Sequence, residues 1–318
     1  MLSLDDVLRA RETIAGRLHR TPTLTSATLS RLTGADVRLK AELFQRTGSF
    51  KPRGVLNKLA WLGEEEKSRG VIGISAGNHA QALAYGAAEE EVDALVVMWR
   101  GASEQKIAAT REYGAQVDLE AGNPAEAFAR LEQLLDETGR TLVHPFDDPV
   151  IQAGQGTVGL ELVEDVPEVG VVVVPIGGGG LISGVATALK GLRPDARVIG
   201  VEPETSNAMR AALDAGERVE LTPASIADGL NAPHAGRNAL EVVQKRVDDV
   251  VLVSDAEIED AFRFLYARAK LACEPAGAAS TAALLAGKVP FEQGETVALV
   301  VSGGNVAGET ASAILARR

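Results

Sequence analysis

Three segments of the chain place glycines directly after a run of β-branched residues, where backbone amides could bind an anion. They are Ser75-Ala-Gly-Asn-His79, Gly177–Gly180 and Ser302-Gly-Gly-Asn305, and each precedes a helical pattern. In open parallel sheets, ligands bind beyond the carboxyl ends of strands, where glycine lets amides approach and a helix N-terminus adds partial positive charge. The three segments could therefore face one small anionic ligand.

The glycine run Gly177–Gly180 is compatible with more than one interpretation. A dinucleotide site is suggested by Glu202 at the end of the next strand, about 20 residues on, but Ile182 or Ser183 stands where that motif needs a small third residue. A P-loop is excluded because no Lys-Ser or Lys-Thr pair follows the glycines. The run suits a cup of amides for a monophosphate. The alternative is a tight turn without a ligand.

Lys51 lies in the segment Thr47-Gly-Ser-Phe-Lys51-Pro-Arg-Gly54. A single lysine is ordinarily a solvated surface charge. A lysine amine is also the side chain that can hold an aldehyde cofactor as a Schiff base, provided that burial or nearby positive charge lowers its pKa. The neighbours of Lys51 decide between these two interpretations.

With these neighbours the chain resembles the fold type II pyridoxal-phosphate enzymes, specifically the threonine/serine dehydratase and serine racemase group. The matching pieces follow one another over nearly the whole chain. Besides the segment around Lys51, they are Ser75-Ala-Gly-Asn-His79, His144-Pro-Phe-Asp-Asp148 with Ala153-Gly-Gln-Gly-Thr157, Gly177–Gly180, Ala227-Asp-Gly229, Glu274-Pro-Ala-Gly277 and Ser302-Gly-Gly-Asn305.

The resemblance implies pyridoxal 5'-phosphate as the cofactor, with Lys51 as the catalytic lysine that holds it. It also implies that Gly177, Gly178, Gly179, Gly180 and the adjoining Leu181 bind the cofactor phosphate. It places the Ser302 hydroxyl against the pyridine nitrogen and the Asn78 amide against the phenolic oxygen. Because a hydroxyl is neutral, the ring is a milder electron sink than with a carboxylate partner, which favours prompt loss of a β leaving group.

Ser75, Asn78 and His79 are the candidates for binding the substrate carboxylate, since a hydroxyl, an amide and helix N–H groups meet at one turn. The alternative is that Ser75 caps the helix, with Asn78 and His79 in its first turn. Gly229, in a piece that resembles the substrate-side loop of the family, is a further candidate.

Three more residues are candidate site residues: Phe50, Asp228 and Glu274. Phe50 precedes the lysine, and Asp228 belongs to the substrate-side loop. Glu274 resembles the acidic residue that the family has near the cofactor, although an acid at a helix start is explained equally well by the helix macrodipole.

Three departures from the family pattern refine the expectation. Racemases of this group have a second serine as an acid/base where this chain has Ala76, so dehydration is favoured over racemisation. Glu202 matches one ligand of a divalent-cation site, but Ala208 stands at the second ligand position, so we expect no metal. Many relatives have a proline after Met98, where this chain has Trp99; we expect Trp99 to pack on a surface or to shape the substrate entrance.

The elements that must position these residues alternate between β-branched runs and helical patterns, which predicts an α/β fold with open, mostly parallel sheets flanked by helices. A capping box, Ser254-Asp-Ala-Glu257, begins the amphipathic run Ile258–Lys270. The expected strands are Val37–Leu43, Val71–Ser75, Ala94–Met98, Thr141–His144, Val171–Ile176, Val198–Glu202 and Thr296–Ser302.

The 318 residues suffice for two lobes. We expect a large cofactor-binding domain of residues 1–52 and 147–318 and a small domain of residues 53–146, with the site between them. The uncharged stretch Gly170–Leu189 is as long as a membrane span, but Gly177–Gly180 would interrupt a helix there. We therefore interpret this stretch as a strand, a glycine turn and a helix. As a separate expectation, the chain has no C-terminal regulatory domain.

Composition limits the partners. A net charge of −12 disfavours nucleic acid and anionic membranes as partners. The single cysteine, Cys273, permits no intrachain disulfide, and the acidic N-terminus is unlike a signal peptide, so we expect a cytoplasmic protein. The resemblance implies a small amino-acid substrate and a homodimer.

The leading hypothesis is a pyridoxal-phosphate dehydratase that converts L-threonine, L-serine or a close β-hydroxy amino acid to a 2-oxo acid and ammonia. A serine racemase with side elimination, a threo-3-hydroxyaspartate dehydratase and a β-replacement synthase are the alternative enzymes. A protein that holds the cofactor without turnover and an NAD-binding protein are alternatives of other classes.

Overall fold

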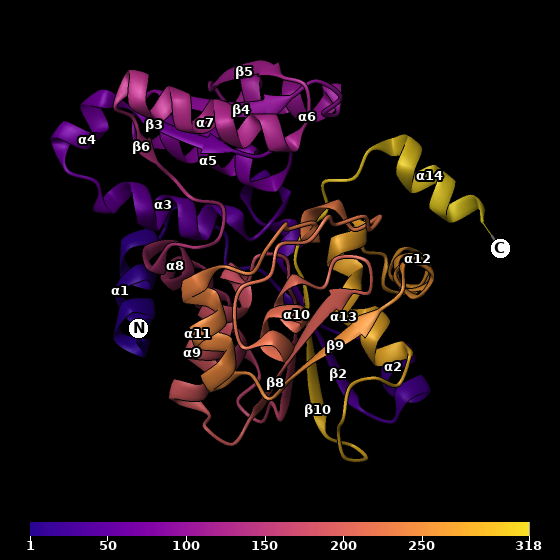
Figure 1. Cartoon of the computed structure of the whole chain (residues 1–318). Helices are drawn as coiled ribbons and strands as arrows, with labels where there is room; N and C mark the ends of the chain where they lie inside the picture. Colours follow the sequence, from indigo (N-terminus) through magenta and orange to yellow (C-terminus); the bar gives the residue numbers. More distant parts are fainter. Residues whose placement is uncertain (318) are drawn as a thin grey trace.

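A computed structural model describes residues 1–317 and contains two open β-sheets (Figure 1). The larger sheet has six strands in the order β1-β2-β10-β7-β8-β9, all parallel except for the β1–β2 pair. Its strands are β1 (Thr23–Thr25), β2 (Asp36–Ala41), β7 (Val171–Pro175), β8 (Arg197–Pro203), β9 (Asp249–Val253) and β10 (Thr296–Val301).

The smaller sheet has four parallel strands in the order β5-β4-β3-β6. Its strands are β3 (Val71–Ile74), β4 (Ala94–Trp99), β5 (Gln116–Ala121) and β6 (Thr141–Leu142). All four lie within the expected small domain, whereas the expected boundary at residue 53 falls inside helix α3 (Lys51–Trp61).

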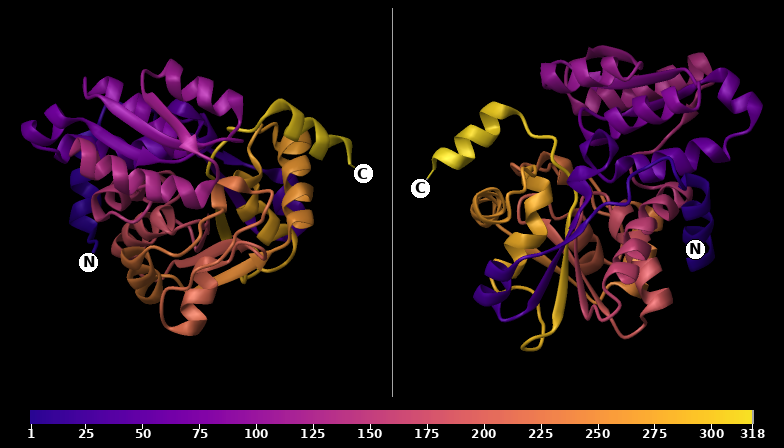
Figure 2. Two further views of the ribbon diagram at one scale, coloured as in Figure 1. Left: turned by 45° about the horizontal axis from the view of Figure 1, so that its top comes forward. Right: turned by 180° about the vertical axis from the view of Figure 1, so that it is seen from behind.

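Helices cover both faces of each sheet, as parallel strands require. In Figures 1 and 2 the first and last helices lie at opposite sides of the molecule. Besides α3, the helices are α1 (Leu4–Ile14), α2 (Ala27–Thr33), α4 (Glu64–Arg69), α5 (Asn78–Glu89), α6 (Glu104–Glu112), α7 (Pro124–Thr138), α8 (Pro149–Asp165), α9 (Gly180–Leu192), α10 (Ala208–Ala215), α11 (Arg237–Arg246), α12 (Asp255–Phe264), α13 (Pro275–Leu285) and α14 (Gly308–Ala316).

The core of the larger sheet shows why its strands read as continuous apolar runs. Val171 and Val173 pack with α12 and α13 on one face, while Val172 and Val174 pack with α9 on the other. Successive side chains of a strand point to opposite faces, so a strand covered by helices on both sides needs apolar residues throughout.

The seven expected strands are confirmed to within two residues at each end, and β1, β5 and β9 were not expected. The capping box is confirmed, because Ser254 Oγ accepts from the Glu257 N–H and the Glu257 carboxylate accepts from the Ser254 N–H. The expected run to Lys270 is α-helical only to Phe264 and then forms a π-helical turn over Leu265–Ala269.

The uncharged stretch Gly170–Leu189 consists of β7, the glycine turn and the start of α9, as expected. Among the described residues, no helix combines the length and apolar character needed to cross a bilayer. The segment after β10 differs from the expectation, because α14 begins only at Gly308 and does not follow Gly304 directly.

Candidate active site

A cavity of about 950 Å³ lies between the carboxyl ends of the strands of the two sheets, and we call it the central cavity. Segments that follow β3 and β7 line it, and the segment after β10 contributes Ser302, so all three segments reach one space. The predicted site residues that line it are Phe50, Lys51, Ser75, Asn78, His79, Gly177, Gly178, Gly179, Gly180, Leu181, Asp228, Gly229, Glu274 and Ser302.

Lys51 is the first residue of α3, and its side chain reaches the central cavity. Its Nζ donates a hydrogen bond of 2.8 Å to the carbonyl oxygen of Pro145 and lies 5.2 Å from the centroid of the Phe50 ring. Burial lowers the pKa of Lys51 to about 8, while the nearby Glu274 carboxylate opposes that shift. The amine is therefore neutral far more often than a surface lysine at the same pH.

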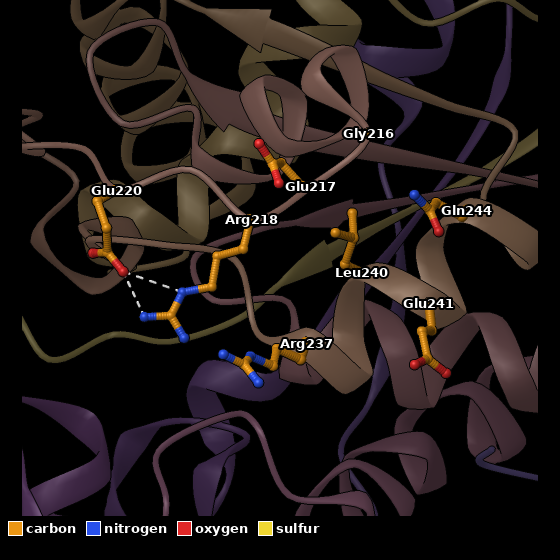
Figure 3. A pocket seen from close by; sticks show the side chains of 8 residues that line it. All are labelled: Gly216, Glu217, Arg218, Glu220, Arg237, Leu240, Glu241 and Gln244. Carbon is orange, nitrogen blue, oxygen red and sulfur yellow. Dashed lines mark hydrogen bonds and ion pairs between the residues drawn. The ribbon is translucent and has the colours of Figure 1, made fainter.

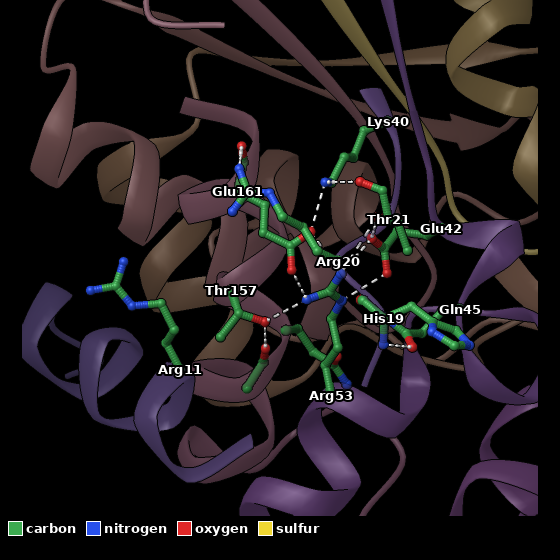
Figure 4. A network of polar contacts seen from close by, with 12 residues as sticks. Arg11, His19, Arg20, Thr21, Lys40, Glu42, Gln45, Arg53, Thr157 and Glu161 are labelled. Carbon is green, nitrogen blue, oxygen red and sulfur yellow. Dashed lines mark hydrogen bonds and ion pairs between the residues drawn. The ribbon is translucent and has the colours of Figure 1, made fainter. Parts of the chain in front are cut away.

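Arg53, one residue beyond Pro52 in α3, anchors the segment that carries Lys51 (Figure 4). Its side chain is 1% exposed and binds Glu42 through Nε–Oε2 and Nη2–Oε1 contacts of 2.8 and 2.9 Å. Nη1 also donates to Glu161 Oε1 over 2.7 Å, and Lys40 Nζ donates to Glu161 Oε2 over the same distance. This buried network ties α3 to the end of β2 and to α8.

The glycine run has a packing reason as well as a chemical one. A β-carbon on Gly178 would lie 2.5 Å from Phe146 Cδ1, and one on Gly180 would lie 2.9 Å from the Phe146 carbonyl oxygen. Gly179 has a φ of +95°, which favours glycine. Helix α9 begins at Gly180 without a side-chain cap, so its first amides are available to an anion in the central cavity.

The turn after β3 offers a second set of amides. Ser75 Oγ accepts a hydrogen bond of 3.1 Å from the Gly77 N–H, and Gly77, not Ser75, is the residue that precedes α5. Asn78 and His79 occupy the first turn of α5, and no side chain caps that helix. A carboxylate could therefore receive N–H groups from this turn.

The His79 ring does not offer a donor to the cavity. Its Nε2 lies 2.8 Å from the Val143 carbonyl oxygen, which can only accept, so Nε2 carries the proton and Nδ1 does not. Burial lowers the pKa of His79 to about 3, so the ring is neutral at physiological pH. Any contact of His79 with a bound anion is through its backbone N–H.

Glu274 directs its carboxylate into the central cavity rather than onto the helix that it precedes. It is 3% exposed, makes no side-chain cap to α13 and accepts a hydrogen bond of 2.7 Å from Asn78 Nδ2. Burial raises the pKa of Glu274 to about 7, with a further contribution from Asp228, so it changes charge near neutrality. Of the two interpretations of Glu274, the geometry favours a site residue.

Asp228 and Gly229 lie in a short 3-10 helix, Asp228–Leu230, on the side of the larger sheet. The Asp228 carboxylate pairs with Lys106 of α6, which joins the two sides of the cavity at its rim. Gly229 packs against the glycine run, since a β-carbon on Gly177 would lie 3.3 Å from the Gly229 carbonyl oxygen.

Glu202 does not belong to the site. Its carboxylate accepts hydrogen bonds of 2.8 Å from the backbone N–H groups of both Met209 and Arg210, in the first turn of α10. Burial raises its pKa, and these two amides oppose the rise. Both carboxylate oxygens of Glu202 therefore cap the start of α10. Residues 1–317 contain no cluster of three His, Cys, Asp or Glu side chains suited to a metal.

Several residues of the cavity were not predicted. Pro145 and Phe146 belong to the matching segment after His144, which was the available signal, but their roles depend on a backbone carbonyl and a close approach. Lys106 and His234 had no sequence signal. Trp99 is partly buried, packs against the core beside β3 and also lines the cavity.

A second hollow of about 650 Å³ lies on the surface beside α11 (Figure 3). Arg218 and Glu220, which pair with each other, line both this hollow and the central cavity. Its remaining side chains are mostly charged and solvent-facing, and none of the predicted site residues lines it.

Known proteins resemble this chain over nearly all of its length. The sequence matches the family described as "Pyridoxal-phosphate dependent enzyme" over residues 14–303. The L-threonine ammonia-lyase of Thermotoga maritima is 47% identical over 308 residues, which cover 96% of this chain and 76% of the relative. The catabolic L-threonine dehydratase of Escherichia coli strain K12 is 42% identical over 307 residues, with 96% and 93% covered. The structure of maize serine racemase matches with a TM-score of 0.94 at 36% identity, covering 98% of this chain and 96% of that chain.

Proposed function

The chain belongs to the pyridoxal-phosphate dependent enzyme family, and from this premise we propose that it is an L-threonine ammonia-lyase that releases a 2-oxo acid and ammonia. The observation that carries the proposal is the low-pKa amine of Lys51, which shares one cavity with an uncapped glycine turn and a second uncapped helix start. The first turn suits a phosphate and the second suits the carboxylate of an amino acid.

The donor set fits pyridoxal phosphate. We propose that Lys51 holds its aldehyde carbon and that the amides of the Gly177–Gly180 turn and Leu181 hold its phosphate. Ser302, at the end of β10, would face the pyridine nitrogen, and the N–H₂ of Asn78 would face the phenolic oxygen. When bound, this group supplies an electron sink for the substrate α-carbon. A neutral Ser302 hydroxyl keeps that sink mild.

Lys51 is the residue that we propose moves the substrate proton. With a pKa of about 8, about one lysine in ten is neutral at pH 7, and the neutral Nζ can accept the proton on the substrate α-carbon. The carbonyl of Pro145 holds Nζ in place before substrate binds. Loss of the α-proton and the β-hydroxide from threonine leaves an enamine, which water converts to the 2-oxo acid and ammonia.

The first turn of α5 is our proposed site for the substrate carboxylate. The residues Ser75, Asn78, His79 and Gly229 all line the central cavity. This arrangement orients the α-carbon without a cationic side chain. The His79 ring itself is held by its hydrogen bond to the Val143 carbonyl oxygen.

Elimination is favoured over racemisation at this site. Ala76 lines the cavity where a racemase of this group has a serine, and its methyl group cannot return a proton to the substrate. A 3-hydroxyaspartate substrate would bring a second carboxylate, and the two cations that could receive it, Lys106 and Arg218, are already paired with Asp228 and Glu220. We therefore place threonine ahead of both alternatives.

We also propose the organisation that the resemblance implies. The chain would form a large domain of residues 1–52 and 147–318 and a small domain of residues 53–146, with the central cavity between them. We propose that the protein is cytoplasmic and forms a homodimer. Light scattering of the purified protein would test the homodimer through its molar mass.

The experiment that tests the proposed function uses a panel of β-hydroxy amino acids. We expect 2-oxo acid formation with kcat/KM highest for L-threonine, lower for L-serine and lowest for threo-3-hydroxyaspartate. Chiral chromatography after incubation with L-serine should show far less D-serine than 2-oxo acid. Failure to form any 2-oxo acid while the cofactor is fully bound would overturn the proposal.

A further inference from the structure

Asn305 closes the matching segment Ser302-Gly-Gly-Asn305, and the site described above gives it no role. It is half-buried and lies between two segments of the proposed active site. Its Nδ2 donates hydrogen bonds of 2.7 Å both to the carbonyl oxygen of Thr47 and to Oδ1 of Asn78. Thr47 belongs to the segment before Lys51, so Asn305 connects this segment to the turn after β3.

The two contacts of Asn305 determine which way the Asn78 amide points. A backbone carbonyl can only accept, so the group of Asn305 that faces Thr47 must be its N–H₂. The same N–H₂ faces Asn78, whose nearer atom must therefore be the oxygen Oδ1. The N–H₂ of Asn78 is left on the other side, where it donates to Glu274 in the cavity.

This constraint does not depend on the charge of Glu274. A protonated carboxyl can donate as well as accept, so Glu274, whose pKa is raised to about 7, does not by itself fix the Asn78 amide near neutral pH. The Thr47 carbonyl never titrates. Through Asn305, the Thr47 carbonyl therefore fixes the orientation of the Asn78 amide, which we place against the cofactor.

Asn305 also holds a strained segment. Thr47 has a φ of +58° and a ψ of +13°, in the left-handed region that a β-branched residue rarely adopts. The Asn305 bond to its carbonyl and the bond of 2.9 Å from the Gly304 N–H to the Gly48 carbonyl bind this turn to the segment after β10. A β-carbon on Gly48 would lie 2.6 Å from Asn305 Oδ1, so the two segments are in close contact.

We propose that Asn305 is a positioning residue that holds the Asn78 amide with its N–H₂ toward the cofactor while it ties down the turn before Lys51. The proposal rests on the proposed cofactor contact of Asn78. It does not need threonine to be the substrate, because its test is read from cofactor binding.

The test compares Asn305→Asp with Asn305→Ala in the purified holoenzyme. The aspartate has the same size but offers only acceptors, so it attracts the Asn78 N–H₂ and turns the Asn78 oxygen toward the cavity. The alanine removes the donor and leaves Glu274 to orient Asn78. We expect Asn305→Asp to raise the Kd for pyridoxal phosphate about tenfold or more, the value of one hydrogen bond to a charged group, and to shift the visible absorbance of the bound cofactor. Asn305→Ala should have a smaller effect on both.

Two further variants separate positioning from stability. Asn57→Asp is the matched control, because Asn57 donates a hydrogen bond of 2.7 Å to the Val150 carbonyl elsewhere in α3. It should lower the melting temperature without shifting the absorbance. In the Asn78→Ala background, Asn305→Asp should produce no further absorbance shift, since the amide that it turns is gone.

The proposal is overturned if Asn305→Ala perturbs the cofactor as much as Asn305→Asp, or if Asn305→Asp has the same spectral effect with and without Asn78. If Asn305→Asp does not fold, the cycle is run with Asn305→Ala, and equal effects in both backgrounds overturn the proposal. Absence of threonine turnover in the wild type would contradict the proposed function and leave this measurement valid.

Discussion

Replacement of Gly178 by alanine tests whether the glycine run is a cofactor cup shaped by close packing. A β-carbon at this position would lie 2.5 Å from Phe146 Cδ1, whereas carbon atoms in contact are about 3.5–4.0 Å apart. The ring must therefore retreat by about 1 Å or more. It also contacts the imidazoles of His144 and His234, at centroid distances of 4.7 and 5.9 Å, so a shift disturbs both contacts.

Two magnitudes follow for Gly178→Ala. Overpacking of this kind costs about 1–3 kcal/mol, which lowers the melting temperature of the apoenzyme by a few degrees. Loss of one amide contact to a charged phosphate costs about 1.5–3 kcal/mol, so the Kd for pyridoxal phosphate should rise about tenfold or more. Scanning calorimetry measures the first quantity and absorbance titration the second.

The clash with Phe146 also predicts a double-mutant result. In a Phe146→Ala background, Gly178→Ala should cost much less stability than in the wild type, because the ring that it meets is absent. Gly308→Ala is the matched control, since a β-carbon there meets nothing within 4 Å. Additive effects of Gly178→Ala and Phe146→Ala, or an unchanged cofactor affinity in Gly178→Ala, would refute the reasoning.

Three other predictions concern the framework and the lysine. Arg53→Leu should lower the free energy of unfolding, measured in urea, by about 3–5 kcal/mol, because it leaves Glu42 buried and unpaired. Arg9→Ala, at an exposed ion pair, should lower it by under about 1 kcal/mol. Equal losses would contradict the role of Arg53 as a buried anchor. Cofactor uptake by the apoenzyme should accelerate as pH rises through about 8, the lowered pKa of Lys51, because only the neutral amine attacks an aldehyde; a stopped-flow rate that is the same one unit on either side would count against it. Glu202→Gln should lower the free energy of unfolding by about 1–3 kcal/mol, because a hydrogen bond that caps α10 is lost. Activity should be insensitive to chelators, and chelator-sensitive activity in the wild type would indicate a metal role.

Sequence reasoning located all the interior strands and the edge strand β6, and missed the edge strands β1, β5 and β9. β5 has polar residues in alternation and β1 has three residues, so neither gives a continuous apolar run. β9 lies at the other edge of the larger sheet, although its Val-Val-Leu-Val run was a usable signal.

Ser75, the glycine run and Ser302 converge on one cavity because each follows the carboxyl end of a parallel strand, a rule that can be applied to a sequence pattern. Sequence pattern could not predict contacts between segments that are distant along the chain. The capping of α10 by Glu202 and the packing of Phe146 on Gly178 are set by tertiary approach, and local sequence encodes neither. The pairing of Lys106 with Asp228 across the cavity has the same origin.

If this chain eliminates water from L-threonine with Lys51 as the acting amine, as we propose, removal of that amine abolishes the reaction. The most direct measurement is the yield of 2-oxo acid and ammonia from L-threonine with the wild-type holoenzyme and with Lys51→Ala supplied with pyridoxal phosphate. We expect the two products in equal amounts from the wild type and none above background from the variant. Equal turnover by both proteins, or consumption of threonine without ammonia, would contradict it.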